Sequence, residues 1–170
     1  LFGRDEDAIL KFHYSISPDT AKYVAQLMDE QGIKPEFEMF DIADVKYLNR
    51  LAKDGTAKTP YWVSMLFNGN GTIPTPDMML AATRALPDNS LLNVIGIGAA
   101  QFPMLAMAMI LGHHVRVGLE DNVFYAPREL AQGNGQMVER VVRLARELGR
   151  PIATPEQARK MMGLGAPRAY

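Results

Sequence analysis

The chain has 170 residues, a formal net charge of −1, 48% hydrophobic and 22% charged residues, and no cysteine. This balance is ordinary for a globular domain, and no basic cluster points to nucleic acid or to an anionic membrane surface. The lack of cysteine excludes disulfides and thiolate metal ligands and is compatible with a reducing compartment. The longest apolar run, residues 102–112, is shorter than the roughly 18 residues of a membrane span. With no secretory signal at the start, we expect a cytoplasmic protein that binds neither nucleic acid nor a membrane.

Helix starts and apolar periodicity predict an alternation of strands and helices. A capping hydroxyl stands directly before a proline at Ser17-Pro18, Thr75-Pro76 and Thr154-Pro155. Thr154 with Gln157 also forms a capping-box pattern. The expected elements, in chain order, are a helix over about 18–31, a strand 34–41, a helix 43–54, a strand 60–68, a helix 76–86, a strand 91–98, a helix 103–111, a strand 114–120, and helices 135–148 and 155–162.

This order, without a hairpin signal between strands, predicts four parallel strands joined by right-handed crossovers and covered by helices. An open doubly wound sheet and part of a (β/α)8 barrel both qualify. Strand polarity favours the barrel: Glu36 and Glu38 alternate with Phe37 and Met39, whereas strands of an open α/β sheet are apolar on both faces. Since a complete barrel takes about 250 residues, we expect residues 1–170 to be a single partial domain, the C-terminal half of a TIM barrel whose N-terminal half is absent.

The run HHVRVGLEDN, residues 113–122, combines an aliphatic face with a polar one. Glu120 is expected at the end of the strand on its inner face, and Asp121 turns into the following loop. Arg116 lies four residues earlier on the same face, about 13 Å below at about 3.3 Å per residue. Its long side chain could reach upward past Gly118 to pair with Asp121 or to hold a substrate carboxylate. The alternative is a purely structural ion-pair network inside a barrel.

This run resembles the β-keto acid cleavage enzymes, a family of zinc-dependent (β/α)8 barrels. The likeness extends over nearly the whole chain, through KPEFEMFD, WVSMLFNGNGTIPT, IGIG…QFPM and GRPIATPEQAR. It implies a reaction that joins a β-keto acid to acetyl-CoA and yields acetoacetate and a new CoA thioester. It also implies that Glu120 binds zinc beside the two histidines of an H-x-H, and that Arg116 and Asp121 transfer protons and orient the substrate. Zinc would act as the electrophile that polarises the keto oxygen.

The histidines of this sequence depart from the family pattern. No H-x-H is present, and the three histidines are His13, His113 and His114. The last two are adjacent, so on a strand they point to opposite faces and cannot bind one ion. Catalytic zinc takes three protein ligands, so we expect zinc only with two histidines from the missing half. His114 is expected to be a hydrogen-bonded core residue, and His13 and His113 have no expected role.

Other inner-face and loop residues are candidates for substrate binding. Glu38, near the strand end, and the deeper Glu36 could contact the keto acid, unless this strand simply exposes a solvated face. Loops after late barrel strands often bind phosphate, so CoA contacts are expected at Asn68, Gly69, Gly96 and Gly98, with plain turns as the alternative. A dinucleotide fingerprint is rejected because Gln101 replaces its third glycine and no acidic residue follows about 20 positions on.

Residues 103–111 are apolar all round, whereas an outer barrel helix should show a polar face to water. We therefore expect a homo-oligomer in which a second subunit covers this helix. The resulting hypothesis is a zinc-dependent acyltransferase that acts on a β-keto acid and acetyl-CoA. Two alternatives stay open: a metal-dependent barrel lyase or aldolase without CoA, and a non-catalytic half-barrel that completes its sheet against a partner chain.

Overall fold

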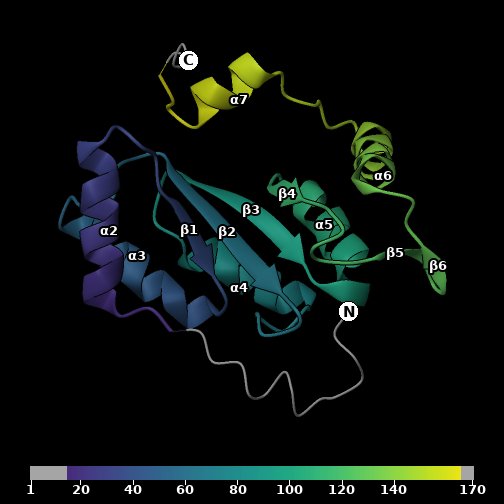
Figure 1. Cartoon of the computed structure of the whole chain (residues 1–170), viewed down its shortest axis with the longest axis horizontal. Coiled ribbons are helices and arrows are strands. Elements are labelled where there is room, and N and C mark those ends of the chain that lie inside the picture. Colours follow the sequence, from purple (N-terminus) through teal and green to yellow (C-terminus); the bar gives the residue numbers. More distant parts are fainter. Residues whose placement is uncertain (1–14, 166–170) are drawn as a thin grey trace.

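The computed structural model describes residues 15–165, which form a parallel sheet with covering helices (Figure 1). In chain order the elements are α2 (Pro18–Glu30), β1 (Glu36–Met39), the 3-10 turn η1 (Ile42–Asp44), α3 (Val45–Lys53), β2 (Tyr61–Phe67), α4 (Pro76–Ala85), β3 (Ser90–Gly96), the 3-10 turn η2 (Gly98–Ala100), α5 (Gln101–Ile110), β4 (His114–Arg116), β5 (Phe124–Ala126), β6 (Glu129–Leu130), α6 (Asn134–Glu147) and α7 (Pro155–Met161). The predicted helices and the four main strands are therefore present. Within the same residues, every helix is too short or too polar to cross a lipid bilayer.

The three predicted helix starts are confirmed by their hydrogen bonds. The side chains of Ser17, Thr75 and Thr154 each accept a hydrogen bond from the backbone N–H three residues later. Gln157 completes the capping box by returning a side-chain bond to the N–H of Thr154. These caps satisfy N–H groups that have no partner inside the helix, which explains why the helices begin where the sequence predicts.

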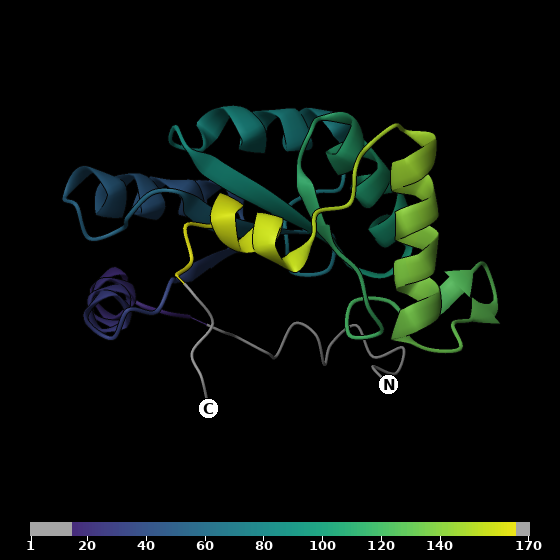
Figure 2. The same ribbon diagram turned by 90° about the horizontal axis from the view of Figure 1, so that it is seen from above.

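The four strands β1 to β4 are hydrogen-bonded in sequence order, and all neighbours are parallel. On one face of β2, Val63, Met65 and Phe67 are fully buried. They pack in a core with α3, α4, α5 and α6, and Figure 2 shows α3, α4 and α5 along one side of the sheet. The opposite face carries Glu36, Glu38, Ser64, Asn93 and Arg116 among apolar residues such as Leu66 and Ile95, and polar groups on this face are expected for the inner wall of a barrel. This confirms the predicted four-stranded parallel architecture with covering helices.

The strand predicted over 114–120 is shorter than expected. β4 ends at Arg116, and residues 119–121 form a turn in which the N–H groups of Asp121 and Asn122 bond to the carbonyl of Gly118. Glu120 therefore lies in a turn, and its placement at the end of an inward-facing strand was wrong. The alternation of residues 117–120 resembled a strand, but the chain turns after Gly118, whose carbonyl accepts the two hydrogen bonds of the turn.

The small hairpin formed by β5 and β6 was not predicted. Its two strands are antiparallel and irregular in register. Arg128 in the connecting turn has a positive φ of 68°, a conformation for which glycine or asparagine is the usual signal. Asn122 supports the start of the hairpin, because its amide donates to the carbonyl of Phe124 and accepts from the N–H of the same residue. With arginine in the turn, the sequence carries no ordinary hairpin signal.

His113, to which the sequence assigned no role, connects β4 to α4. Its Nε2 lies 2.8 Å from Thr83 Oγ1, and this hydroxyl donates its hydrogen to the carbonyl of Met79. Nε2 must therefore carry the proton in this contact. Burial lowers the pKa of His113, and the charges of His114 and Arg150 lower it further.

The lowered pKa of the half-buried His113 predicts a pH dependence of stability. Because the folded chain resists protonation of His113 while the unfolded chain does not, stability should be complete above the ordinary pKa of 6.5 and fall as the pH drops below it. Melting temperatures measured by circular dichroism from about pH 7.5 to about pH 5 should therefore decrease, and His113→Gln should reduce this decrease. An unchanged pH profile in the variant would contradict this assignment.

Candidate functional site

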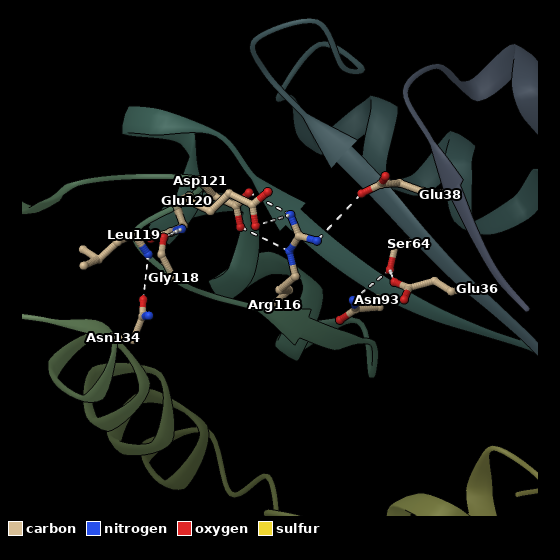
Figure 3. A network of polar contacts seen from close by, with 11 residues as sticks. Glu36, Glu38, Ser64, Asn93, Arg116, Gly118, Leu119, Glu120, Asp121 and Asn134 are labelled. Carbon is tan, nitrogen blue, oxygen red and sulfur yellow. Dashed lines mark hydrogen bonds and ion pairs between the residues drawn. The ribbon is translucent and has the colours of Figure 1, made fainter. Parts of the chain in front are cut away.

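The polar face of the sheet carries a cluster of charged groups centred on Arg116 (Figure 3). Arg116 is the last residue of β4, and its guanidinium makes a two-point contact with Asp121. Nε donates to one carboxylate oxygen at 3.2 Å, and Nη2 donates to the other at 2.9 Å. The Asp121 side chain is only 4% exposed, whereas that of Arg116 is 37% exposed. Of the two roles that the sequence allowed for Arg116, the pairing with Asp121 is therefore present, and the arginine remains partly exposed to solvent.

The backbone around Asp121 explains why its carboxylate turns back toward β4. The Asp121 N–H bonds to the carbonyl of Gly118, and the Asp121 carbonyl accepts the N–H of Gly98 at 2.7 Å. Gly98 has a positive φ of 59° and lies in the loop after β3. The loops after β3 and β4 therefore hold each other, and the side chain of Asp121 is fixed between them.

Glu38 and Glu120 complete the cluster at longer distances. Glu38 Oε1 lies 3.8 Å from Arg116 Nη1, and Glu120 Oε2 lies 3.9 Å from Nη2. The Glu120 side chain is 85% exposed, so its ion pair adds little stability and its carboxylate can take another partner. The hydrogen bond to Asp121 is the main cause that raises the pKa of Arg116, and the charges of Asp121, Glu120 and Glu38 add to it against the effect of burial. The arginine is therefore a permanent cation.

Glu36 lies outside the Arg116 cluster. It accepts a hydrogen bond from the hydroxyl of Ser64, and Ser64 accepts one from Asn93 Nδ2 at 2.9 Å. Ser64 and Asn93 are both buried and were missed by the sequence analysis. A detectable signal existed, because each is a polar residue within an otherwise apolar strand, at a position that faces the same side as Glu36.

The glycine-containing loops proposed to contact CoA are packed against each other. Asn68 and Gly69 have positive φ angles of 74° and 62°, and Asn68 Nδ2 donates to the carbonyl of Ile97. A Cβ atom on Gly96 would lie 2.5 Å from the Cα of Gln101, which leaves no space for it. Asn68 and Gly69 therefore pack the loop after β2 against Ile97, and Gly96 allows the close approach of Gln101. This structural function is independent of the proposed CoA contacts.

Two further expectations are changed by the structure. Gly118 does not make room for Arg116: a Cβ there would lie 3.2 Å from Asn134 Oδ1, which accepts the N–H of Leu119. The glycine thus allows helix α6 to approach the site loop. The sequence predicted a hydrogen-bonded core histidine at position 114. In the structure the half-buried ring of His114 packs against Trp62, with centroids 5.5 Å apart and the ring planes at 44°. Burial is the main cause that lowers the pKa of His114. His13 lies outside the described residues.

Residues 15–165 do not assemble a zinc site by themselves. Within them, no group of three histidine, aspartate or glutamate side chains is arranged to hold a metal ion. The exposed carboxylate of Glu120 offers one ligand, and catalytic zinc takes three from the protein. The donor set found here is therefore incomplete for the metal that the resemblance implies.

Comparison with known proteins identifies the family. A family model for beta-keto acid cleavage enzyme matches residues 6–164. The chain belongs to the β-keto acid cleavage enzyme family. It is 44% identical to the 3-keto-5-aminohexanoate cleavage enzyme of Acetoanaerobium sticklandii, over 96% of this chain and 56% of that protein. It is also 32% identical to the 3-oxoadipate:acetyl-CoA acetyltransferase of Cupriavidus necator, over 89% and 55%, and 30% identical to the 3,5-dioxohexanoate:acetyl-CoA acetone transferase of Paraburkholderia graminis, over 84% and 48%.

The chain spans about half the length of these relatives. A four-stranded parallel sheet with covering helices is half of the strand complement of a (β/α)8 barrel. The fold and the relative lengths are therefore consistent with half of a barrel, as the strand polarity predicted.

The close approach at Gly96 predicts a large difference between two glycine variants. Gly96→Ala should lower the free energy of unfolding by about 1–3 kcal/mol, because the new Cβ meets the backbone of Gln101. Gly135→Ala, in helix α6, meets no atom within 4 Å and should be neutral or stabilise by up to about 1 kcal/mol. Urea denaturation measures both. A Gly96→Ala variant as stable as the wild type would show that the glycine has no packing function.

Proposed function

We propose that the protein carrying this chain cleaves a β-keto acid with acetyl-CoA and releases acetoacetate and a new acyl-CoA. Family membership and the acetyl-CoA transferases among its relatives support this reaction class. The observation that carries the proposal is the two-point contact between Arg116 and Asp121, with Glu38 and Glu120 beside it. We also propose a cytoplasmic location, with which the lack of cysteine is compatible.

In this proposal Asp121 transfers protons and Arg116 orients both Asp121 and the substrate. Nε and Nη2 of the arginine are bound to Asp121, whereas Nη1 faces Glu38 at 3.8 Å. This distance is longer than a strong charge-assisted hydrogen bond, so an anionic group of the substrate can approach Nη1. Glu38, and more deeply Glu36, would line the substrate pocket.

We propose Glu120 as one zinc ligand, with two histidines supplied from outside the described residues. Its high exposure and its position next to Asp121 support this assignment. A bound Zn²⁺ would polarise the keto oxygen of the substrate. The residues of this chain would then place the proton-transfer carboxylate of Asp121 and the cation of Arg116 beside that oxygen.

Contacts to CoA are proposed for the loops after β2 and β3, at Asn68, Gly69, Gly96 and Gly98. Two of these residues already use a donor inside the fold, because the N–H of Gly98 binds Asp121 and the side chain of Asn68 binds Ile97. Phosphate contacts in these loops would therefore involve the other backbone groups, above all those of Gly69.

We propose that a second copy of the protein covers helix α5. A shallow apolar groove of about 380 Å³ runs between α4 and α5, and Leu80, Met107 and Ile110 are among the residues that line it. Ile110 is 69% exposed. Helices α4 and α5 follow the two central strands, β2 and β3. The other half of a barrel would continue the sheet at its outer strands, β1 and β4. It would therefore not cover α4 and α5, and a second copy of the protein is the proposed cover.

The oligomer proposal predicts the effect of a charge at this surface. Ile110→Glu should weaken self-association at least about 10-fold, because the carboxylate would be buried without a partner. Val138→Glu, on the exposed face of α6, should leave the assembly unchanged. Sedimentation velocity over a concentration series measures both. Equal masses for wild type and Ile110→Glu would exclude this surface as the contact.

The reaction is tested by incubating the protein, in the form that includes the rest of its barrel, with β-keto acids and labelled acetyl-CoA. Mass spectrometry should detect labelled acetoacetate. Asp121→Asn should lower kcat by about 10²–10⁴-fold, since it removes the proton acceptor. Glu139→Gln, an exposed carboxylate on α6, should leave kcat unchanged.

Three outcomes would contradict the proposal in different ways. Cleavage without acetyl-CoA would indicate a lyase or aldolase. Full activity of Asp121→Asn would remove the aspartate from the chemistry. No cleavage of any acid, in a folded and metal-loaded protein, would favour the non-catalytic half-barrel.

A further inference from the structure

Two buried polar residues occupy the central strands beneath the Arg116 cluster. In the register of the sheet, Glu38, Ser64, Asn93 and His114 are direct neighbours across β1 to β4. The hydroxyl of Ser64 nevertheless bonds to Glu36, which is the partner of Trp62 two pairs earlier in the register. Ser64 therefore donates its hydrogen bond to Glu36 and not to Glu38, which is its direct neighbour in the register.

The hydrogen bonds of this group run in one direction. Asn93 Nδ2 donates to Ser64 Oγ at 2.9 Å, and Ser64 Oγ donates to the carboxylate of Glu36. Because the amide of Asn93 occupies an acceptor site of the hydroxyl, the hydroxyl hydrogen is directed to Glu36. Ser64 and Asn93 are buried, which shields the bond between them from water, whereas Glu36 itself is exposed.

The two glutamates of β1 consequently have different partners. Their side chains lie on the same face two residues apart, on the side of the sheet that carries the guanidinium of Arg116 (Figure 3). Glu36 is held by Ser64, whereas Glu38 lies 3.8 Å from Arg116 Nη1. Without Ser64, Glu36 would be a second carboxylate free to turn toward the guanidinium.

We infer that Ser64 and Asn93 are positioning residues, which hold Glu36 away from Arg116 and so reserve the guanidinium for Asp121, Glu38 and the substrate. This inference rests on the proposed function for its catalytic consequence. Its structural part is that Glu36 is bound to Ser64 while the contacts of Arg116 are with Asp121, Glu38 and Glu120.

A double-mutant cycle between Ser64→Ala and Glu36→Gln tests the inference. Ser64→Ala should lower kcat by about 10- to 100-fold and change KM less than about 2-fold, because the freed Glu36 disturbs Arg116. In the Glu36→Gln background the same change should alter kcat by less than about 2-fold, since no competing charge remains. Asn93→Leu should reproduce part of the Ser64→Ala effect. Ser90→Ala, which removes a serine bond to the Pro87 carbonyl elsewhere on β3, is the matched control and should have no effect.

The nitrogen resonances of the arginine side chain give a readout that does not depend on activity. The Arg116 Nε–H signal, assigned by its loss in Arg116→Lys, should shift in Ser64→Ala and return in the double variant. If Ser64→Ala acts equally in both backgrounds, or leaves this signal unchanged, Ser64 serves packing alone and the inference is overturned. If the wild type forms no acetoacetate, the proposed function fails, while the resonance still decides the inference.

Discussion

The site depends on one contact, the two-point hydrogen bonding of Arg116 to the buried carboxylate of Asp121. A carboxylate with so little access to water requires donors from the protein, and the planar guanidinium supplies two of them. The backbone carbonyl of Asp121 is bound at the same time by the N–H of Gly98. Asp121 is thereby held through both its side chain and its backbone. Because Glu120 precedes Asp121 in the same turn, its position is fixed as well.

The parallel sheet explains why these groups meet. Parallel strands place all their carboxyl ends at one edge, and alternate residues separate a face packed on helices from a polar face. Glu38 of β1 can therefore approach Arg116 of β4 across two intervening strands. On those central strands Ser64 and Asn93 are level with Glu38, whereas Leu66 and Ile95 are level with Arg116. On this face the hydrogen-bonded group of Glu36, Ser64 and Asn93 lies nearer the amino ends of the strands. The charged group of Arg116, Asp121 and Glu38 lies nearer their carboxyl ends.

Sequence reasoning predicted the elements that have local signals and missed those that depend on tertiary contacts. Proline-preceded caps such as Thr75-Pro76 located the helices, and strand alternation located Glu38 and Arg116 on one face. The strand end after Arg116 was misplaced because the alternating pattern continues through the turn. The hairpin was missed because its turn uses Arg128 at a positive φ. The function of Gly118, to admit Asn134, depends on a helix that comes later in the chain.

Arg116 and Asp121 should be energetically coupled, and a double-mutant cycle on protein stability measures this coupling most directly. Unfolding free energies would be compared for the wild type, Arg116→Met, Asp121→Asn and the double variant. The two changes should be strongly non-additive, with a coupling of about 1–3 kcal/mol. A coupling indistinguishable from zero would show that the two-point contact does not hold the site together.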